Sequence, residues 1–157
     1  MKRLVQIALA TLFVIGLTVS KGQAQEATKV QSIQPPSYPW TAAQLLEPAD
    51  LAAQIKTGNT KLLILNIGAV EDIKGATHIG PVSKTENMEL LQKTVSAYAK
   101  STTVVIYCGC CPFTKCPNVR PAFTELTKMG FTHIKVLNLP VNLHTNWISL
   151  GFPLAAN

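Results

Sequence analysis

All the cysteines of this 157-residue chain lie close together, as Cys108, Cys110, Cys111 and Cys116. An apolar, β-branched run at residues 103–107 precedes them, and a helical pattern begins just beyond them. A loop between a strand and a helix N-terminus favours thiolates, because the unpaired amides of the first helical turn point into the loop. Disulfides between such close neighbours would close tiny loops and remove little entropy from the unfolded chain. The spacing therefore indicates chemistry or metal binding rather than a stapling framework.

Alternating helical and apolar segments must position this loop. Helices are predicted over residues 47–58, 84–99, from 118 or 120 to 129, and 146–151, and strands over 61–68, 103–107 and 133–138. The nearly continuous apolar runs are typical of strands buried on both faces. Short connections between strands and helices predict an α/β domain whose parallel sheet carries helices on both faces. Ligands of such sheets bind beyond the carboxyl ends of the strands, where the cysteine loop begins.

Several local signals set the expected boundaries. Ser83 and Glu86 have the spacing of a capping box at a helix start. Asn118 or Arg120 is expected to cap the third helix, which Gly130 ends. The apolar face of the second helix is expected to consist of Met88, Leu91, Val95 and Tyr98. Residues 77–81 are expected to form a turn, and residues 38–40 an aromatic anchor at the domain edge.

The N-terminus has the pattern of an export signal. Lys2 and Arg3 precede an uncharged apolar run over residues 4–20, and small residues follow at Gly22 and Ala24. This order is typical of a cleaved secretory signal peptide. We therefore expect a signal peptide at residues 1–24, a flexible leader at 25–37 and one domain at 38–157. The protein would be periplasmic or secreted, with no stable membrane insertion after cleavage.

The charge of the chain argues against a nucleic-acid partner. The formal net charge is +6, from 14 basic and 8 acidic residues. Cleavage would remove Lys2, Arg3 and Lys21, which leaves 11 basic residues against 8 acidic ones and a charge of about +3. The remaining lysines are scattered singly, with no basic stripe and no interleaved aromatic residues. We therefore expect no binding to nucleic acid.

The order of motifs resembles the rhodanese-like domain family of sulfurtransferases. The segments that carry the resemblance are residues 62–68, 75–81, 104–108, 126–137 and 147–154. They occur in the family's order and span nearly all of residues 40–154. The chain departs from the family in its longer cysteine loop, and in Asn66 and Gly68, which replace an aspartate and an arginine of the family's first motif. The resemblance implies a rhodanese-like sheet, here with an extended cysteine-rich loop.

The resemblance also implies a sulfurtransferase that needs no cofactor. A cysteine at the strand end would take sulfur from a small sulfur-containing anion, form a persulfide and pass the sulfur to a thiol acceptor. Counting from the strand assigns this role to Cys108, and counting back from the helix points near Cys111. Lys115 and Arg120 would hold the anionic donor. Cys110 and Cys116 would be resolving or additional thiols.

Three other interpretations of the cysteines stay open. Cys108 and Cys111 have the C-x-x-C spacing of a dithiol/disulfide oxidoreductase. Three or four of the thiolates could bind a soft metal such as copper or zinc. The candidate ligands are then Cys108, Cys110, Cys111 and Cys116. The last interpretation is a non-catalytic rhodanese-like binding module.

Overall fold

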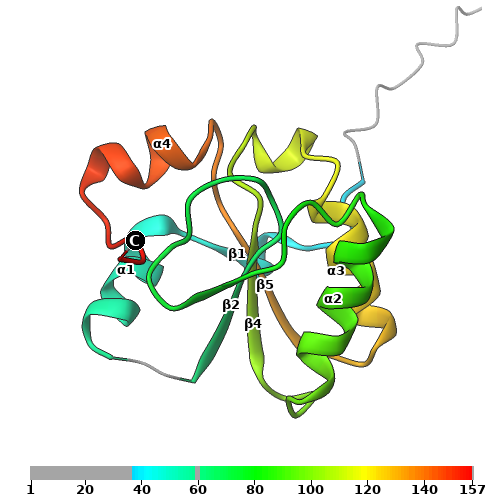
Figure 1. The fold of residues 1–157 in the computed structure, drawn as a ribbon. Helices are drawn as coiled ribbons and strands as arrows, with labels where there is room; N and C mark the ends of the chain where they lie inside the picture. The colour runs from blue at the N-terminus through cyan, green and yellow to red at the C-terminus, as the bar shows by residue number, and fades with distance from the viewer. Residues whose placement is uncertain (1–36, 59–60, 157) are drawn as a thin grey trace, which may run out of the picture. The chain divides into compact units, whose positions relative to one another are not determined.

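A parallel sheet of five strands organises the domain in this computed structural model, which describes residues 37–58 and 61–156. The strand order is β1-β5-β4-β2-β3 (Figure 1). The strands are β1 (Leu45–Leu46), β2 (Leu62–Asn66), β3 (Ala76–His78), β4 (Thr103–Tyr107) and β5 (His133–Leu137). The helices are α1 (Pro48–Lys56), α2 (Thr85–Ser96), α3 (Val119–Lys128) and α4 (Leu143–Asn146), with short 3-10 turns η1 (Ala42–Gln44), η2 (Phe113–Lys115) and η3 (Ile148–Leu150).

Helices cover both faces of the sheet. On one face, Val104 and Ile106 of β4 pack with Leu91 of α2 and Leu126 of α3. On the other, Val105 packs with residues of α1 and α4, including Leu51 and Leu143. Successive side chains of a strand alternate between the faces, so the buried apolar residues at consecutive positions from Val104 to Tyr107 are what two covered faces require. This confirms the predicted α/β fold class.

The main elements confirm the predicted order. Strand β4 has the predicted bounds, and β2 and β5 lie within their predicted ranges. Pro48 occupies the first turn of α1, where its missing N–H costs nothing. Gly130 follows α3 with a φ of 89°, a left-handed conformation that ends the helix as expected. Trp40 is 8% exposed and stacks on Tyr38, which confirms the aromatic anchor.

Two strands were not expected. Strand β1 pairs with β5 at the edge of the sheet. It has only two residues, too few to show a periodic pattern in the sequence. Strand β3 falls partly in the predicted turn and pairs with β2 from Ile64↔Ala76 to Asn66↔His78. Its side chains are mostly exposed, so it carries no apolar run. The prediction of a turn is therefore wrong for Thr77 and His78, which belong to β3, whereas Gly80 beyond the strand has a left-handed φ of 82°.

The predicted boundaries of α2 and the last helix are also corrected. Lys84, not Ser83, is the N-cap of α2, and no side-chain cap is formed, so the capping box is wrong. Tyr98 lies beyond the helix and is 41% exposed rather than part of its apolar face. At the C-terminal end, Asn142 caps α4 by accepting from the Thr145 N–H at 2.7 Å. The expected helix at 146–151 is thus the end of α4 followed by η3.

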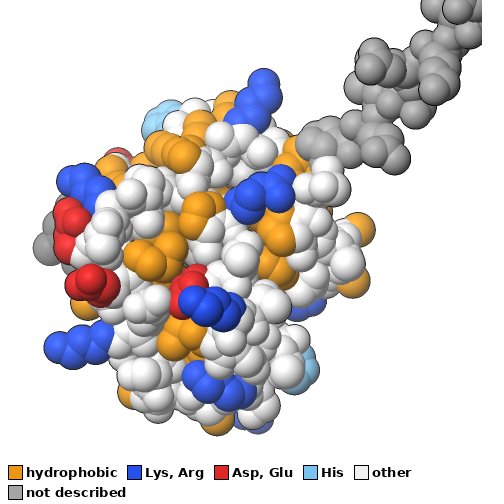
Figure 2. Space-filling model, turned by 90° about the vertical axis from the view of Figure 1, so that its right-hand side faces the viewer, with side chains coloured by type: hydrophobic (Ala, Val, Ile, Leu, Met, Phe, Trp, Pro, Cys, Tyr) orange, Lys and Arg blue, Asp and Glu red, His pale blue; other side chains and the backbone are white. Residues whose placement is uncertain are grey.

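On the face drawn in Figure 2, Lys and Arg side chains stand apart from one another rather than in one band. None of the helices within residues 37–58 and 61–156 is long and apolar enough to cross a membrane. The predicted signal peptide, and all of the predicted leader except Ser37, lie outside the described residues, so these remain predictions.

Candidate active site

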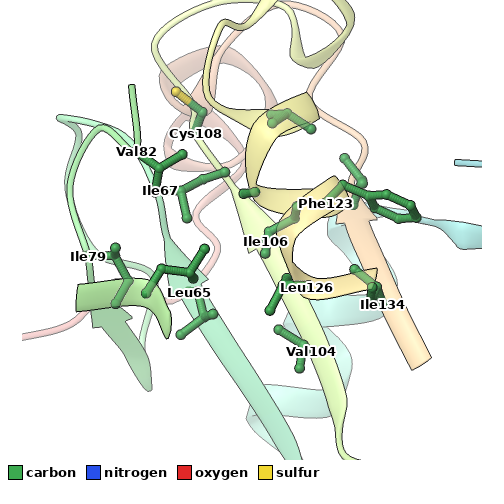
Figure 3. Close-up of a cluster of buried hydrophobic side chains, with 14 of the residues drawn as sticks. Leu65, Ile67, Ile79, Val82, Val104, Ile106, Cys108, Phe123, Leu126 and Ile134 are labelled. Atoms are coloured by element: carbon green, nitrogen blue, oxygen red, sulfur yellow. The ribbon is translucent and has the colours of Figure 1, made fainter. Parts of the chain in front are cut away.

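Cys108 is the first residue after β4 and lies on the face covered by α2 and α3. The alternation along β4 puts Val104, Ile106 and Cys108 into the same buried cluster, and Figure 3 shows the Cys108 sulfur at its upper end. Cys108 is 1% exposed. Gly68 allows this position, because a Cβ there would overlap the Cys108 carbonyl oxygen and lie 2.8 Å from its Sγ. The glycine that departs from the family motif is thus required by close packing against the cysteine.

The loop after Cys108 is held by segments far away in the chain. Gly109 has a φ of 75°, and its carbonyl accepts from the Leu143 N–H of α4 at 2.8 Å. A side chain at Gly109 would lie 2.8 Å from the Leu143 side chain. The Phe113 N–H donates to the Leu139 carbonyl at 3.1 Å, so the loop after β5 braces the cysteine loop. These bonds hold Gly109 and Phe113, which lie between the first and last cysteines, against the rest of the domain in this closed arrangement.

This backbone brings three thiols together. The Sγ atoms of Cys108, Cys110 and Cys116 all lie within 4.8 Å of one another. Cys108 and Cys110 are 3.3 Å apart, and Cys110 and Cys111 are 3.5 Å apart. All four cysteines are free thiols. We call Cys108, Cys110 and Cys116 the thiol cluster. The sulfur that lies 3.3 Å from Cys108 therefore belongs to Cys110, rather than to the Cys111 that C-x-x-C spacing suggested.

The thiols differ in exposure. Cys108 and Cys116 are buried, Cys111 is partly buried, and Cys110 is exposed. A reagent from solvent therefore meets Cys110 before either buried sulfur. The cluster has one outer and two inner thiols.

Asn118 ties the cluster to the rest of the domain. Its Nδ2 donates to the Cys108 Sγ at 3.3 Å, and its Oδ1 accepts from the Ser83 N–H at 3.0 Å. Asn118 is 4% exposed and holds the N-cap position of α3, but makes no side-chain cap bond there. The sequence predicted a cap and missed the contact to Cys108. The signal that was present is an asparagine at the helix start, ten residues after the cysteine.

The environment of Cys108 favours its thiolate. The Cys116 thiol, the Asn118 amide, the Cys110 thiol and the Cys110 backbone N–H all donate to its sulfur and together outweigh burial. They lower the pKa of Cys108 to about 5. Burial and the neighbouring Cys108 and Cys111 sulfurs raise the pKa of Cys110 to about 12. The hydrogen bond to Cys108, burial and the charge of Cys108 raise the pKa of Cys116. The cluster thus holds one negative charge, centred on Cys108.

The N-terminus of α3 donates hydrogen bonds to the Cys116 sulfur, and not directly to the Cys108 sulfur as expected. The backbone N–H groups of Asn118 and Val119 point to Cys116 and lower its pKa, although the hydrogen bond to Cys108 and burial outweigh them. The sequence predicted a loop thiolate stabilised by the first turn of the helix. In the structure the helix amides hold Cys116, and Cys116 in turn donates to Cys108. The stabilisation of Cys108 by the helix start is therefore indirect.

The two predicted donor-binding residues lie on the surface near the loop. Lys115 is exposed in η2. Arg120 is exposed and its Nη2 donates to the Ser37 carbonyl at 2.9 Å, with its guanidinium 5.8 Å from the Tyr38 ring. Trp40 lies between this segment and the cysteine loop, since its ring is 6.1 Å from that of Phe113. Binding of an anion by either cation stays a prediction.

Asn66, the other departure from the family motif, belongs to a polar network at the end of β2. Its Nδ2 donates to the Val70 carbonyl and to Asp72 Oδ1, both at 2.8 Å, and its Oδ1 accepts from the Gly68 N–H. His78 Nδ1 lies 2.9 Å from Asp72 Oδ1. These contacts shape the turn that carries Gly68 under Cys108.

A separate cavity of about 270 Å³ lies at the carboxyl ends of β1 and β5, and its lining includes Glu47 and Asn138 but no cysteine.

Solved structures match this chain, but no protein-family model and no curated protein sequence does. Among solved structures, the rhodanese-like domain of the Alr3790 protein from Anabaena shares 20% identity over 73% of this chain and 80% of that one, with a TM-score of 0.53. The BH2092 protein of Bacillus halodurans shares 19% identity over 71% and 76% of the two chains, with a TM-score of 0.54. A protein from Lactobacillus plantarum shares 16% over 73% and 89%, with a TM-score of 0.54. The chain therefore has the rhodanese-like fold.

Proposed function

We propose that the protein is an exported sulfurtransferase that carries a persulfide on Cys108. One observation carries the proposal: the Cys108 Sγ lies at the carboxyl end of the central strand and accepts hydrogen bonds from Asn118 Nδ2 and neighbouring thiols. Donors aimed at a sulfur stabilise the anion that attacks and the anion that leaves. The rhodanese-like fold supports the same assignment by analogy.

The reaction conserves sulfur and electrons. The Cys108 thiolate attacks the outer sulfur of a donor such as thiosulfate, the sulfur–sulfur bond of the donor breaks, and sulfite leaves with the bonding pair. A thiolate or cyanide then attacks the outer sulfur of the persulfide, and the Cys108 thiolate is regenerated. No external oxidant or reductant is consumed. Lys115, exposed beside the loop, is proposed to attract the anionic donor.

Burial of Cys108 makes loop movement a part of this proposal. Because Cys108 is 1% exposed, a donor reaches its Sγ only when residues 109–116 shift. The outer thiol of Cys110 donates a hydrogen bond to the Cys108 sulfur at 3.3 Å, and we expect it to be the first group to move. We therefore propose that loop opening limits the rate of donor attack.

The test is sulfur transfer by the reduced, metal-free protein. Incubation with thiosulfate should add about 32 Da, one sulfur, to the intact mass, and cyanide should remove it as thiocyanate. Cys108→Ser should abolish both the mass gain and the thiocyanate. Retention of the mass gain in that variant, with loss in Cys111→Ser, would move the nucleophile to Cys111. Absence of any mass gain in the wild-type protein would refute the proposal.

A further inference from the structure

The thiol cluster has the composition of a soft-metal site as well as that of a nucleophile. We propose that Cys108, Cys110 and Cys116 bind one Cu(I) ion as a three-coordinate thiolate site. The proposal goes beyond sulfur transfer and does not depend on it, although both use Cys108. It rests on three sulfurs from separate positions of one loop that converge within 4.8 Å.

The distances suit a single ion. With metal–sulfur bonds of about 2.3 Å, three sulfurs in a plane around a metal lie about 4 Å apart. The Cys108–Cys110 separation is 3.3 Å, and no separation in the cluster exceeds 4.8 Å. Shifts of less than about 1 Å at each sulfur, small enough to stay within one rotamer well, would therefore bring all three to bonding distance (about 2.3 Å).

The number of ligands favours Cu(I). Structural zinc is bound by four ligands, and iron–sulfur clusters take four cysteines as a rule. Among the His, Cys, Asp and Glu side chains of residues 37–58 and 61–156, the group able to meet at this place consists of three thiols. Cu(I) selects soft sulfur ligands and accepts three of them in a plane.

The surroundings supply what a bound ion needs. Asn118 Nδ2 already donates to Cys108, and backbone N–H groups of Asn118 and Val119 point to Cys116, so both inner sulfurs are oriented by outer-shell donors. Both inner thiols belong to the apolar cluster, which keeps water from the metal. The exposed Cys110 offers the route by which a soft ion is exchanged with a donor in solvent. Binding releases the remaining thiol protons to solvent and transfers no electron.

The experiment titrates the full reduced chain with Cu(I) under anaerobic conditions, against a chromogenic Cu(I) chelator, in the absence of any sulfane donor. Native mass spectrometry should give one ion per chain. Cys110→Ser and Cys116→Ser should each weaken Cu(I) binding by at least about 100-fold, since outer-shell partners alone change metal affinity by 10–100-fold. Cys111→Ser is the matched control, because Cys111 lies next to the cluster but outside it. It should keep the wild-type affinity.

Several results would overturn the proposal. These are no competition with the chelator, an equal loss of affinity in Cys111→Ser, or tighter binding of Zn(II) than of Cu(I). Circular dichroism checks that the variants fold. Should Cys116→Ser unfold, the exposed position of Cys110 keeps Cys110→Ser decisive. The readout is separate from the persulfide test, which uses no metal, so either proposal can fail while the other stands.

Discussion

The Asn118 amide joins the Cys108 sulfur to the start of α2, because its Nδ2 donates to Cys108 Sγ at 3.3 Å while its Oδ1 accepts from the Ser83 N–H at 3.0 Å. Asn118 is also the residue from which α3 begins. One buried side chain thus links the end of β4 with two helices on the same face of the sheet. The position of the amide is fixed by its Ser83 bond, so its donor is already aimed at the sulfur before any ligand arrives.

Asn118→Ala tests this link. Loss of the Nδ2 donor should raise the pKa of Cys108 from about 5 by about one unit, as expected for a hydrogen bond to a charged group worth about 1.5 kcal/mol. Persulfide formation should therefore slow several-fold near pH 5, where the variant holds less thiolate than the wild-type protein. The measurement is the rate of mass gain with thiosulfate. Asn142→Ala is the matched control, since Asn142 caps α4 and its side chain accepts from Thr145. That variant should lose about 1 kcal/mol of stability and keep the wild-type rate. Equal rates in the two variants would contradict the role of Asn118.

The ionisation of the cluster predicts a pH dependence. In the reduced, metal-free protein, the ultraviolet absorbance of a thiolate should rise with a midpoint of about pH 5, because hydrogen bonds from Cys116, Asn118 and Cys110 lower the pKa of Cys108. Below that pH the sulfur is protonated and the absorbance is lost. Cys108→Ser should remove this low-pH step. Absence of the low-pH step in the wild-type protein would contradict the arrangement.

Exposure predicts the order in which the cysteines react. A bulky maleimide should modify Cys110 and Cys111 before the other two cysteines, because Cys110 is exposed and Cys111 is partly buried. Cys108 and Cys116 should react last despite the thiolate on Cys108, since a buried sulfur cannot be reached without loop movement. Peptide mapping after short exposures gives the order. In guanidinium chloride, which unfolds the protein, the differences in labelling rate among the four cysteines should disappear. Early labelling of Cys108 in the native protein would contradict the prediction and show that the loop is open.

How far the sequence predicts this site depends on the kind of contact. Strand β4 and the face that Cys108 occupies follow from the alternation of apolar residues, which is local. The convergence of Cys116 on Cys108 does not, because it needs bonds from Gly109 to Leu143 and from Phe113 to Leu139, over 34 and 26 positions of the chain respectively. The sequence likewise predicts that Asn118 caps its own helix, which is a short-range role. In the folded chain its side chain instead accepts a hydrogen bond from the Ser83 N–H, 35 residues away. Strand β1 is missed because two residues carry no period.

Gly68 offers a test of the close packing beneath Cys108. Gly68→Ala places a Cβ against the Cys108 carbonyl oxygen and 2.8 Å from its Sγ, and these are backbone and short buried atoms that cannot move aside. The variant should lose about 2–3 kcal/mol of stability by overpacking, and the displaced Cys108 should lose most of its sulfur-transfer rate. Gly75→Ala is the control, because a Cβ there meets nothing within 4 Å and suffers only from a φ of 83°. It should cost about 1–2 kcal/mol and leave the rate unchanged. Chemical denaturation and the thiosulfate assay measure both effects. A Gly68→Ala protein with wild-type rate would mean that the exact position of Cys108 against β2 does not matter for its chemistry.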